Sequence, residues 1–338
     1  MPNRGVRVLI AAGVIVLAAA LIVPLLLSDS SPLRQRTPAV TPAPPVGEAT
    51  SVPLPPTGAY VGAWVRPERN TEQDRIDAVE AFEDRVGRTL DIVHHYHTWD
   101  DFFPSEFDLL FGKRANTTLL ISWATADTRE IVAGDYDRMI RLRAKDLKAM
   151  KVPVLMQWRW EMDRPNLESV VHEPEDYIAA WKRIRSLFHE EGAANVDWVW
   201  CPLSEGFGNG RAPRYYPGDD QVDWLCTDSY TVTPTEPLLT GLQPFFAWAK
   251  AKDKPIMIGE FGTQAGGVGQ RARWLADVGR MARRNPQVKA LLYFDSNVDR
   301  DGRKRDWSLQ SHPEDVRAYG QLMAEPYFNP RRLRTGDG

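Results

Sequence analysis

The sequence predicts an α/β protein whose main domain is a (β/α)8 barrel, the TIM-barrel architecture. Three observations predict this fold: eight short apolar runs follow one another, amphipathic helical segments separate several of them, and the eight repeats occupy about 280 residues. Alternating strands and helices favour a parallel sheet with right-handed crossovers. Eight repeats in this length fit a closed barrel better than an open sheet.

Each apolar run is bounded by polar, proline or glycine positions and is too short for a typical helix, which is typical of a buried parallel strand. We expect strands at Ala59 to Val65, Asp91 to His97, Thr117 to Trp123, Pro153 to Trp160, Val196 to Pro202, Val222 to Tyr230, Pro255 to Glu260 and Val288 to Asp295. Helical periodicity predicts helices at Tyr136 to Met150, Pro174 to Glu191, Pro244 to Ala251 and Gln270 to Arg284.

Residues 1–27 are predicted to form a transmembrane signal anchor. Arg4 and Arg7 precede an uncharged stretch from Val8 to Leu27, which has about the length that a bilayer core requires. The positive charges predict that this end lies inside and the rest of the chain outside. Because no clear A-x-A site follows Leu27, an uncleaved anchor is favoured over a cleaved signal, which would give a secreted protein. We therefore expect a single-pass protein of the cell membrane with an extracytoplasmic domain.

Residues 28–57 are rich in Pro, Ser, Thr and Ala and show no apolar periodicity. This composition predicts a disordered, semi-extended linker that holds the domain away from the membrane. The folded domain is expected at residues 58–330. No motif in the sequence specifies an oligomeric state.

The composition restricts the class of partner. A formal net charge of −3 supplies no strong basic field, which excludes a nucleic-acid partner. The chain has twelve tryptophans, many of them near predicted strand ends. Tryptophan stacks well on the apolar face of a pyranose ring, and it is also a good core residue, so both interpretations are open at this point.

Two glutamates, Glu161 and Glu260, close predicted strands 4 and 7. A single glutamate after a strand is often a solvated loop residue, but the carboxyl ends of barrel strands are where a barrel keeps its active site. Strands three apart face each other across the mouth. Hydrolysis of a glycosidic bond needs one carboxyl group to protonate the leaving oxygen and a second to attack or stabilise the sugar centre. The pair therefore predicts glycoside hydrolysis.

Four segments carry a resemblance to a known family. They are Pro153 to Asp163, Glu173 to Trp200, Tyr215 to Tyr230 and Lys254 to Gly262. Together and in this order they resemble glycoside hydrolase family 26, which groups β-mannanases with some β-1,3-xylanases and lichenase-type glucanases in the clan of 4/7 retaining barrels. The resemblance extends over residues 58–325.

The resemblance implies a role for each of three residues. Glu161 would be the general acid/base and Glu260 the nucleophile of a double-displacement, retaining reaction. Tyr230 matches the family's tyrosine that donates to the nucleophile, with a packing role as the alternative. Since both catalytic roles belong to carboxyl groups, no cofactor is required.

The sequence departs from the family pattern around Glu161. Family members commonly carry His before the acid/base and Asn-Gly shortly after it, whereas this chain has Trp160 before it and Met162-Asp163 after it. After strand 8 the family presents a Trp, and here the segment is Tyr293 to Ser296. We expect these changes to alter which sugar is accepted, so β-mannan and β-glucan are both candidate substrates.

Further candidates for substrate binding are residues near predicted strand ends. They are Arg159, Trp160, His95, His97, Trp123, Trp200 and Trp307. Arg159 could orient a carboxylate or a sugar hydroxyl, or be a buried cation paired with Asp228. His95 and His97 share one face of a strand and could bind a metal with Asp100 and Asp101, but hydrogen bonds to substrate or backbone are favoured, so we predict no metal site.

The two cysteines, Cys201 and Cys226, fall on neighbouring predicted strands. A disulfide outside the cell and two buried free thiols are both open interpretations. The sequence as a whole predicts a retaining, endo-acting hydrolase of a β-linked polysaccharide. The alternative is a catalytically weak or inactive glycan-binding barrel at the cell surface.

Overall fold

The computed structural model describes residues 51–298 and 305–330. The predicted anchor at residues 1–27 and most of the predicted linker lie outside these ranges. Among the described residues, no helix has the length and apolar character needed to cross a membrane.

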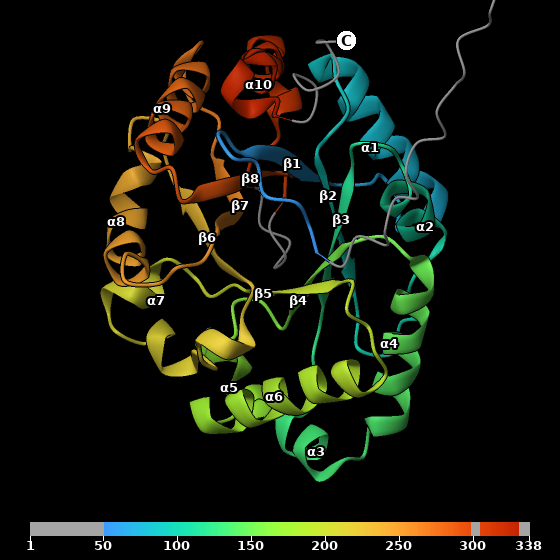
Figure 1. Cartoon of the computed structure of the whole chain (residues 1–338). Helices are drawn as coiled ribbons and strands as arrows, with labels where there is room; N and C mark the ends of the chain where they lie inside the picture. Colours follow the sequence, from blue (N-terminus) through green and yellow to red (C-terminus); the bar gives the residue numbers. More distant parts are fainter. Residues whose placement is uncertain (1–50, 299–304, 331–338) are drawn as a thin grey trace, which may run out of the picture. The chain divides into compact units, whose positions relative to one another are not determined.

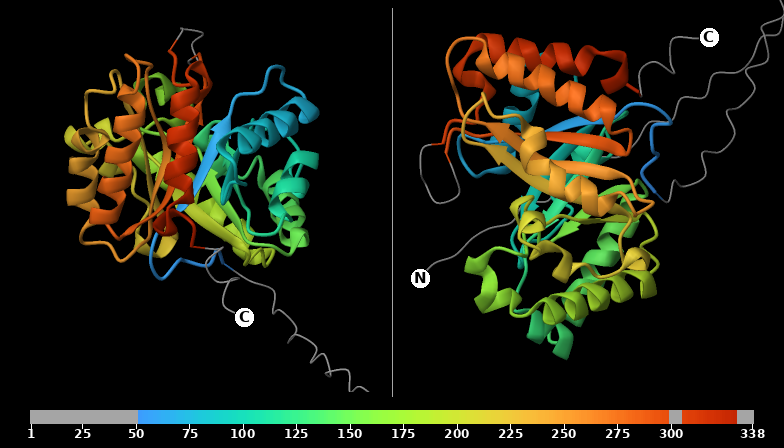
Figure 2. Two further views of the ribbon diagram at one scale, coloured as in Figure 1. Left: turned by 90° about the horizontal axis from the view of Figure 1, so that it is seen from above. Right: turned by 90° about the vertical axis from the view of Figure 1, so that its left-hand side faces the viewer.

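The predicted barrel is confirmed. Eight parallel strands close in sequential order, with β8 hydrogen-bonded to β1, and the helices lie outside the ring of strands (Figures 1 and 2). The strands are β1 (Tyr60–Val65), β2 (Ile92–His97), β3 (Thr118–Trp123), β4 (Val154–Trp158), β5 (Val196–Trp200), β6 (Trp224–Thr231), β7 (Ile256–Thr263) and β8 (Val288–Asp295). Every predicted strand overlaps one of them.

Ten α-helices lie in the described part of the chain. They are α1 (Glu72–Val86), α2 (Glu106–Gly112), α3 (Thr128–Ala133), α4 (Asp137–Met150), α5 (Glu168–Val171), α6 (Pro174–Glu190), α7 (Glu205–Gly208), α8 (Leu238–Ala249), α9 (Gln270–Arg284) and α10 (Pro313–Ala324). Short 3-10 helices occur at η1 (Pro165–Leu167), η2 (Ala212–Tyr215), η3 (Asp219–Gln221), η4 (Leu309–Ser311) and η5 (Pro326–Phe328).

The helix predicted to start at Pro244 begins six residues earlier, at Leu238. Leu238, Leu242, Phe245 and Ala249 are its buried residues, and this helical spacing runs through the proline. Proline lacks a backbone N–H and is usually found only in the first turn of a helix. Here the apolar face is buried against the barrel, and that burial sustains the helix on both sides of Pro244.

Side chains alternate between two cores. One face of each strand packs against the helices, and the other fills the barrel interior with residues such as Leu120, Leu155, Val199 and Met257. Removing each of these side chains from water contributes roughly 1.5–3 kcal/mol. The interior of the barrel is therefore a packed core, and the cavity that could hold a ligand lies at its mouth.

The predicted linker ends earlier than residue 57. Val52 is buried in the interior core, and its N–H donates to Oδ2 of Asp197 (2.9 Å) near the start of β5. The hydroxyl of Tyr60 donates to the carbonyl of Pro53, and Lys289 Nζ donates to the carbonyl of Pro55 (3.2 Å). The segment covers the amino-terminal end of the barrel through a few separate contacts. Such contacts produce no regular spacing of apolar residues in the sequence, so the segment is not recognised as part of the domain.

Cys201 and Cys226 form a disulfide, which excludes the alternative of two free thiols. Cys201 follows β5 and Cys226 lies on β6, with Cα atoms 4.3 Å apart. Gly259, the residue before Glu260, packs against this bridge: a Cβ there would lie 2.5 Å from the sulfur of Cys226 and 2.9 Å from Oδ1 of Asp228. Glycine at this position therefore lets the disulfide lie directly against the middle of β7, beside Glu260.

Candidate active site

Glu161 and Glu260 reach the mouth of the barrel in different ways. Glu260 is part of β7, as predicted. Strand β4 ends at Trp158, so Glu161 does not close the strand as predicted but lies in a turn after it, where Arg159 and Glu161 adopt left-handed φ angles of 41° and 52°. The Glu161 N–H donates to the carbonyl of Cys201 (2.6 Å). This turn removes the strand alternation that would have put Arg159 and Glu161 on one face.

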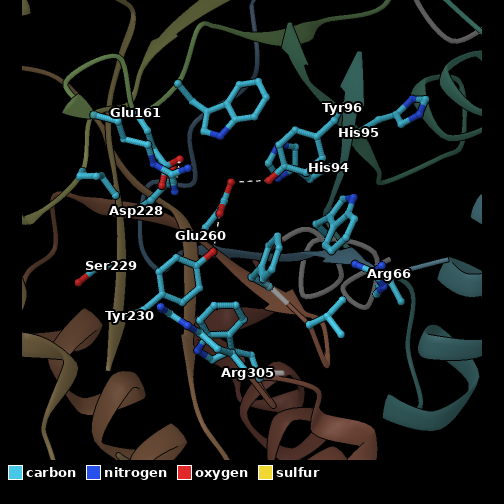
Figure 3. Close-up of a pocket in the computed structure, with 18 of the residues that line it drawn as sticks. Arg66, His94, His95, Tyr96, Glu161, Asp228, Ser229, Tyr230, Glu260 and Arg305 are labelled. Atoms are coloured by element: carbon cyan, nitrogen blue, oxygen red, sulfur yellow. Dashed lines mark hydrogen bonds and ion pairs between the residues drawn. The ribbon is translucent and has the colours of Figure 1, made fainter. Parts of the chain in front are cut away.

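Three buried carboxyl groups meet at the mouth. One carboxylate oxygen each of Glu161, Asp228 and Glu260 lies within 4.8 Å of the other two (Figure 3). Carboxyl groups about 5–5.5 Å apart are typical of retaining glycosidases, whereas inverting enzymes need roughly 6.5–9.5 Å. The separation of Glu161 and Glu260 therefore suits direct attack by one carboxylate on a sugar held between them.

Two phenols hold the carboxylate of Glu260. The hydroxyl of Tyr96 donates to Oε1 and that of Tyr230 donates to Oε2. Burial and the neighbouring charge of Glu260 raise the pKa of both phenols well above the usual range, so both remain protonated donors. Two such donors favour the ionised form of Glu260.

The carboxyl of Glu161 has a different environment. Arg164 Nη2 lies 2.7 Å from Oε2, while Oε1 is buried and has no hydrogen-bond partner in the described part of the chain. Burial raises the pKa of Glu161, the charge of Glu260 raises it further, and Arg164 and Arg159 lower it. The raised pKa favours a carboxyl group that keeps its proton.

Asp228, on β6, is the third carboxyl. Burial raises its pKa well above the ordinary value, and the charges of Glu260 and Glu161 raise it further. Since three carboxylates within 4.8 Å would repel one another strongly, the cluster holds fewer negative charges than carboxyl groups.

A cavity of about 730 Å³ opens over these residues. Of the predicted site residues, seven line it: Glu161, Glu260, Tyr230, Trp160, His95, His97 and Trp307. The structure therefore brings the two glutamates, the predicted tyrosine and most of the predicted aromatic and histidine residues together around one space.

Three predicted site residues do not line the cavity. Trp123 is fully buried against Trp99 (ring centroids 4.4 Å apart), and Trp200 is fully buried with its indole N–H donating to the carbonyl of Tyr215 (3.1 Å). Both face the helices, because alternation sends every second strand residue outward. Arg159 is buried, and its guanidinium donates to the carbonyl of Trp160 (2.9 and 2.8 Å).

Asp108 holds His95 and His97. His95 Nδ1 lies 2.7 Å from Oδ1 of Asp108 and His97 Nε2 lies 2.8 Å from its Oδ2. The main acidic partner is therefore Asp108, at the start of α2, and not the predicted Asp100 or Asp101; Asp101 is 3.9 Å from His97 Nδ1. The three side chains could together ligate an ion. However, both oxygens of Asp108 are already bound to the two imidazoles.

Three features of the site were not predicted from the sequence: Tyr96, Arg164 and a pair of stacked rings, Trp64 and Phe294. Trp64 stacks on Phe294 with centroids 4.6 Å apart and an interplanar angle of 16°. Tyr96 could have been found from alternation, because it lies between two histidines that face the other way. Arg164 carries no such signal, since it lies outside any strand.

Comparison with known proteins gives no match to a family model. Endoglucanase H of Acetivibrio thermocellus is 29% identical over 294 residues, which are 81% of this chain and 31% of that protein. The β-1,3-xylanase TXYA of a Vibrio species is 26% identical over 144 residues, 41% of this chain and 29% of that protein. The chain thus spans about a third of the length of these relatives.

Solved structures share the barrel. The chain is similar to GH26C from Muricauda sp. MAR_2010_75, with a TM-score of 0.58, 12% identity, and 80% and 86% of the two chains covered. It is also similar to a GH26 β-mannanase from Bacteroides ovatus, with a TM-score of 0.55, 13% identity, and 80% and 90% covered. Both solved structures are described as family 26 proteins, so the fold of this chain agrees with the resemblance that the sequence motifs indicated.

Proposed function

We propose that this chain is a retaining, endo-acting glycoside hydrolase that cleaves a β-linked polysaccharide by double displacement. The observation that carries the proposal is the pair of buried carboxyl groups, Glu161 and Glu260, whose oxygens lie within 4.8 Å of each other in the cavity. This separation supports a retaining mechanism, because it leaves too little room for a water molecule to attack from the side opposite the leaving group.

The first step forms a glycosyl-enzyme. The carboxylate of Glu260 attacks the anomeric carbon, and the bond from that carbon to the glycosidic oxygen breaks. Glu161 gives its proton to this oxygen, so the leaving sugar departs as an alcohol. Tyr96 and Tyr230 support the negative charge of Glu260 before the attack.

The second step reverses the roles. Glu161, now a carboxylate, takes a proton from a water molecule whose oxygen attacks the anomeric carbon, and Glu260 leaves as a carboxylate. The charge of Glu260, which raises the pKa of Glu161 in the free enzyme, is absent while Glu260 is esterified. The pKa of Glu161 therefore falls after the first step, which suits its change from acid to base.

The substrate proposed is a β-linked glucan, mannan or xylan. The named relatives are an endoglucanase and β-1,3-xylanases, and solved structures of the same fold include β-mannanases. Aromatic side chains on the cavity wall, among them Trp64, Phe294, Trp160 and Trp307, support stacking of pyranose rings.

The test is release of reducing ends by the full chain from a panel of β-glucans, β-mannans and β-xylans, with Glu161→Gln and Glu260→Gln as controls. Activity on one class, lost in both variants, supports the proposal and identifies the polymer. Activity retained in Glu260→Gln contradicts the double-displacement mechanism.

A second candidate is a glycan-binding barrel with little turnover. The ion pair between Arg164 and Glu161 favours it, because a guanidinium stabilises the ionised carboxylate and opposes its use as an acid. Binding of a polymer with no release of reducing ends, in the same panel, would establish this alternative.

We further propose that residues 8–27 anchor the protein in the cell membrane with the barrel outside. The apolar stretch and the preceding Arg4 and Arg7 support this localisation. Separation of membranes from culture medium and cytosol tests it: the full-length protein should remain with the membranes after a high-salt wash. Recovery of a shortened chain in the medium would show a cleaved signal instead.

A further inference from the structure

Around the cavity, arginines predominate on one side, which also carries Asp101, and glutamates on the other, which also carries Arg164. Arg66, Arg75 and Arg305 contribute to it from the loop after β1, from α1 and from the segment after β8, whereas Glu205 and Glu236 contribute from α7 and the loop before α8. In a ring of eight strands, β1 lies opposite β5, so the arginine side and the glutamate side face each other. Because the chain has a formal net charge of −3, the arginines do not reflect a general excess of positive charge.

Arg66 is the exposed arginine of this set. Its backbone N–H donates to the carbonyl of Asp295 (3.0 Å), which continues the pairing of β1 with β8 by one residue. Within the described part of the chain, no hydrogen bond, ion pair or ring contact involves its guanidinium, which has five N–H donors. Figure 3 shows Arg66 on the side of the cavity away from Ser229.

Arg75 and His95 complete this side of the cavity. Arg75 is held in place by Oε1 of Glu72 and Oδ1 of Asn70, both at 2.6 Å. His95 is only 4% exposed, lines the cavity, and its Nε2 atom has no hydrogen-bond partner in the described residues, while its Nδ1 atom is bound to Asp108. A buried polar atom without a partner at a cavity wall indicates a ligand that supplies one.

The same side offers a surface for a sugar ring. Trp64 is partly exposed to the cavity and packs against Phe294 and, edge-on at 5.6 Å, against Tyr96. Trp64 and Arg66 are two residues apart on an extended chain, so their side chains point to the same face. A pyranose ring on Trp64 would therefore have its substituents within reach of the Arg66 guanidinium.

We propose that the β1 side of the cavity is a subsite for an acidic sugar, so that the polymer cleaved carries anionic groups, as carboxylates or sulfate esters. The inference rests on the proposed function and names the class of its substrate. A guanidinium binds a planar or tetrahedral oxyanion through two parallel N–H bonds. Glu205 and Glu236 repel an anion on the opposite side, so the acidic sugar is accepted in one orientation.

The experiment compares each β-glucan and β-mannan of the panel, whose hexose units carry a C6 hydroxyl, with two derivatives, one oxidised at C6 to carboxylate and one sulfated at C6. The readout is the ratio of kcat/KM on the derivative to kcat/KM on its parent, measured with the full chain at low ionic strength. We expect a ratio of about two to five for the wild type, since partly exposed ion pairs contribute up to about fivefold. Arg66→Gln should bring the ratio close to one. Added salt should lower the ratio of the wild type, because salt screens the charges.

Arg69→Gln is the matched control. Arg69 belongs to the same loop, but its guanidinium is 77% exposed, pairs with Asp74 (3.0 Å) and does not line the cavity. This variant should keep the wild-type ratio. A wild-type ratio of one or less overturns the subsite. An equal fall of the ratio in Arg66→Gln and Arg69→Gln also overturns it. A higher ratio for the oxidised than for the sulfated polymer assigns the carboxylate, and the reverse assigns the sulfate ester.

Binding separates failure of the subsite from failure of the proposed function. If no polymer is cleaved, the hydrolase proposal fails, and the subsite is then tested by retardation of the Glu161→Gln variant in gels containing parent or oxidised polymer. Stronger retardation by the oxidised polymer, lost on adding Arg66→Gln, supports the subsite without turnover. Equal retardation by both polymers overturns it.

Discussion

Glu161 and Glu260 are both buried at the mouth of one barrel, yet their surroundings are nearly opposite. Both oxygens of Glu260 accept a phenol hydroxyl, whereas Glu161 has an arginine on one oxygen and no hydrogen-bond partner within the described residues on the other. Hydrogen-bond donors stabilise a charged carboxylate, and burial without donors favours the protonated form. Two chemically identical side chains are thus prepared for different roles by their neighbours.

The backbone makes the same distinction. Glu260 belongs to a strand paired on both sides, while Glu161 lies in a turn with a left-handed φ, held by its N–H bond to Cys201. A left-handed conformation at a residue other than glycine costs about 1 kcal/mol or more and persists only where surrounding structure enforces it. The comparison therefore predicts a rigid nucleophile and an acid whose position depends on its turn.

The largest expected effect is loss of the nucleophile. Glu260→Gln should lower kcat by about 10⁴-fold or more, because no covalent intermediate can form. Steady-state release of reducing ends measures the loss. Trapping wild-type enzyme with a 2-fluoro glycoside and locating the label on Glu260 by mass spectrometry provides the positive control; a label on Glu161 or Asp228 would reverse the assignment.

Glu161→Gln should lower the rate of polysaccharide cleavage by about 10²- to 10⁴-fold, because the leaving group of a polysaccharide needs a proton. With a dinitrophenyl glycoside, whose leaving group departs without a proton, the rate of the first step should fall much less in the same variant. A burst of dinitrophenol measures that step. Equal losses on the two substrates would show that Glu161 is not the acid.

Removing one phenol hydroxyl should have a smaller effect. Tyr230→Phe and Tyr96→Phe each remove one hydrogen bond to a charged acceptor, worth about 1.5–3 kcal/mol, and should lower kcat/KM by about 10- to 100-fold. The two variants should be similar, because each hydroxyl binds one oxygen of Glu260. Unchanged kcat/KM in both would separate the phenols from the reaction.

Of these variants, Arg164→Gln is expected to cause the largest change in the pH profile and the smallest change in the maximal rate. Arg164 lowers the pKa of Glu161, so removing the guanidinium should raise that pKa. The acid must be protonated to act, and activity is lost as pH rises through its pKa, so the alkaline limb of kcat/KM should move to higher pH. Arg214, an exposed arginine that does not line the cavity, serves as the control in Arg214→Gln. A shift to lower pH would contradict the ion-pair argument.

The strands were predictable because their signal is local. Buried parallel strands appear as short apolar runs, and all eight were found, but their ends were less accurate. Predicted strand 4 continued to Trp160, whereas β4 ends at Trp158, because the left-handed turn at Arg159 and Glu161 begins there. Predicted strand 7 stopped at Glu260, whereas β7 continues to Thr263 through irregular pairing with β8.

The site was partly predictable. Glu161, Glu260 and Tyr230 could be located because they follow or end apolar runs. Tyr96 was missed although it donates to Glu260, 164 residues away in the sequence, since no local pattern links the two. Its position between His95 and His97 shows which face it occupies but not what lies opposite that face.

The sequence by itself determined the barrel and the strands whose ends carry carboxyl groups, because strand order and alternation are properties of neighbouring residues. The tertiary structure alone decided that Trp123 and Trp200 face the helices, that Asp108 binds both histidines, and that Cys201 and Cys226 are bridged. Each of these depends on the register between strands and on which face of a strand points inward. Register arises from packing around the closed ring, which no single segment encodes.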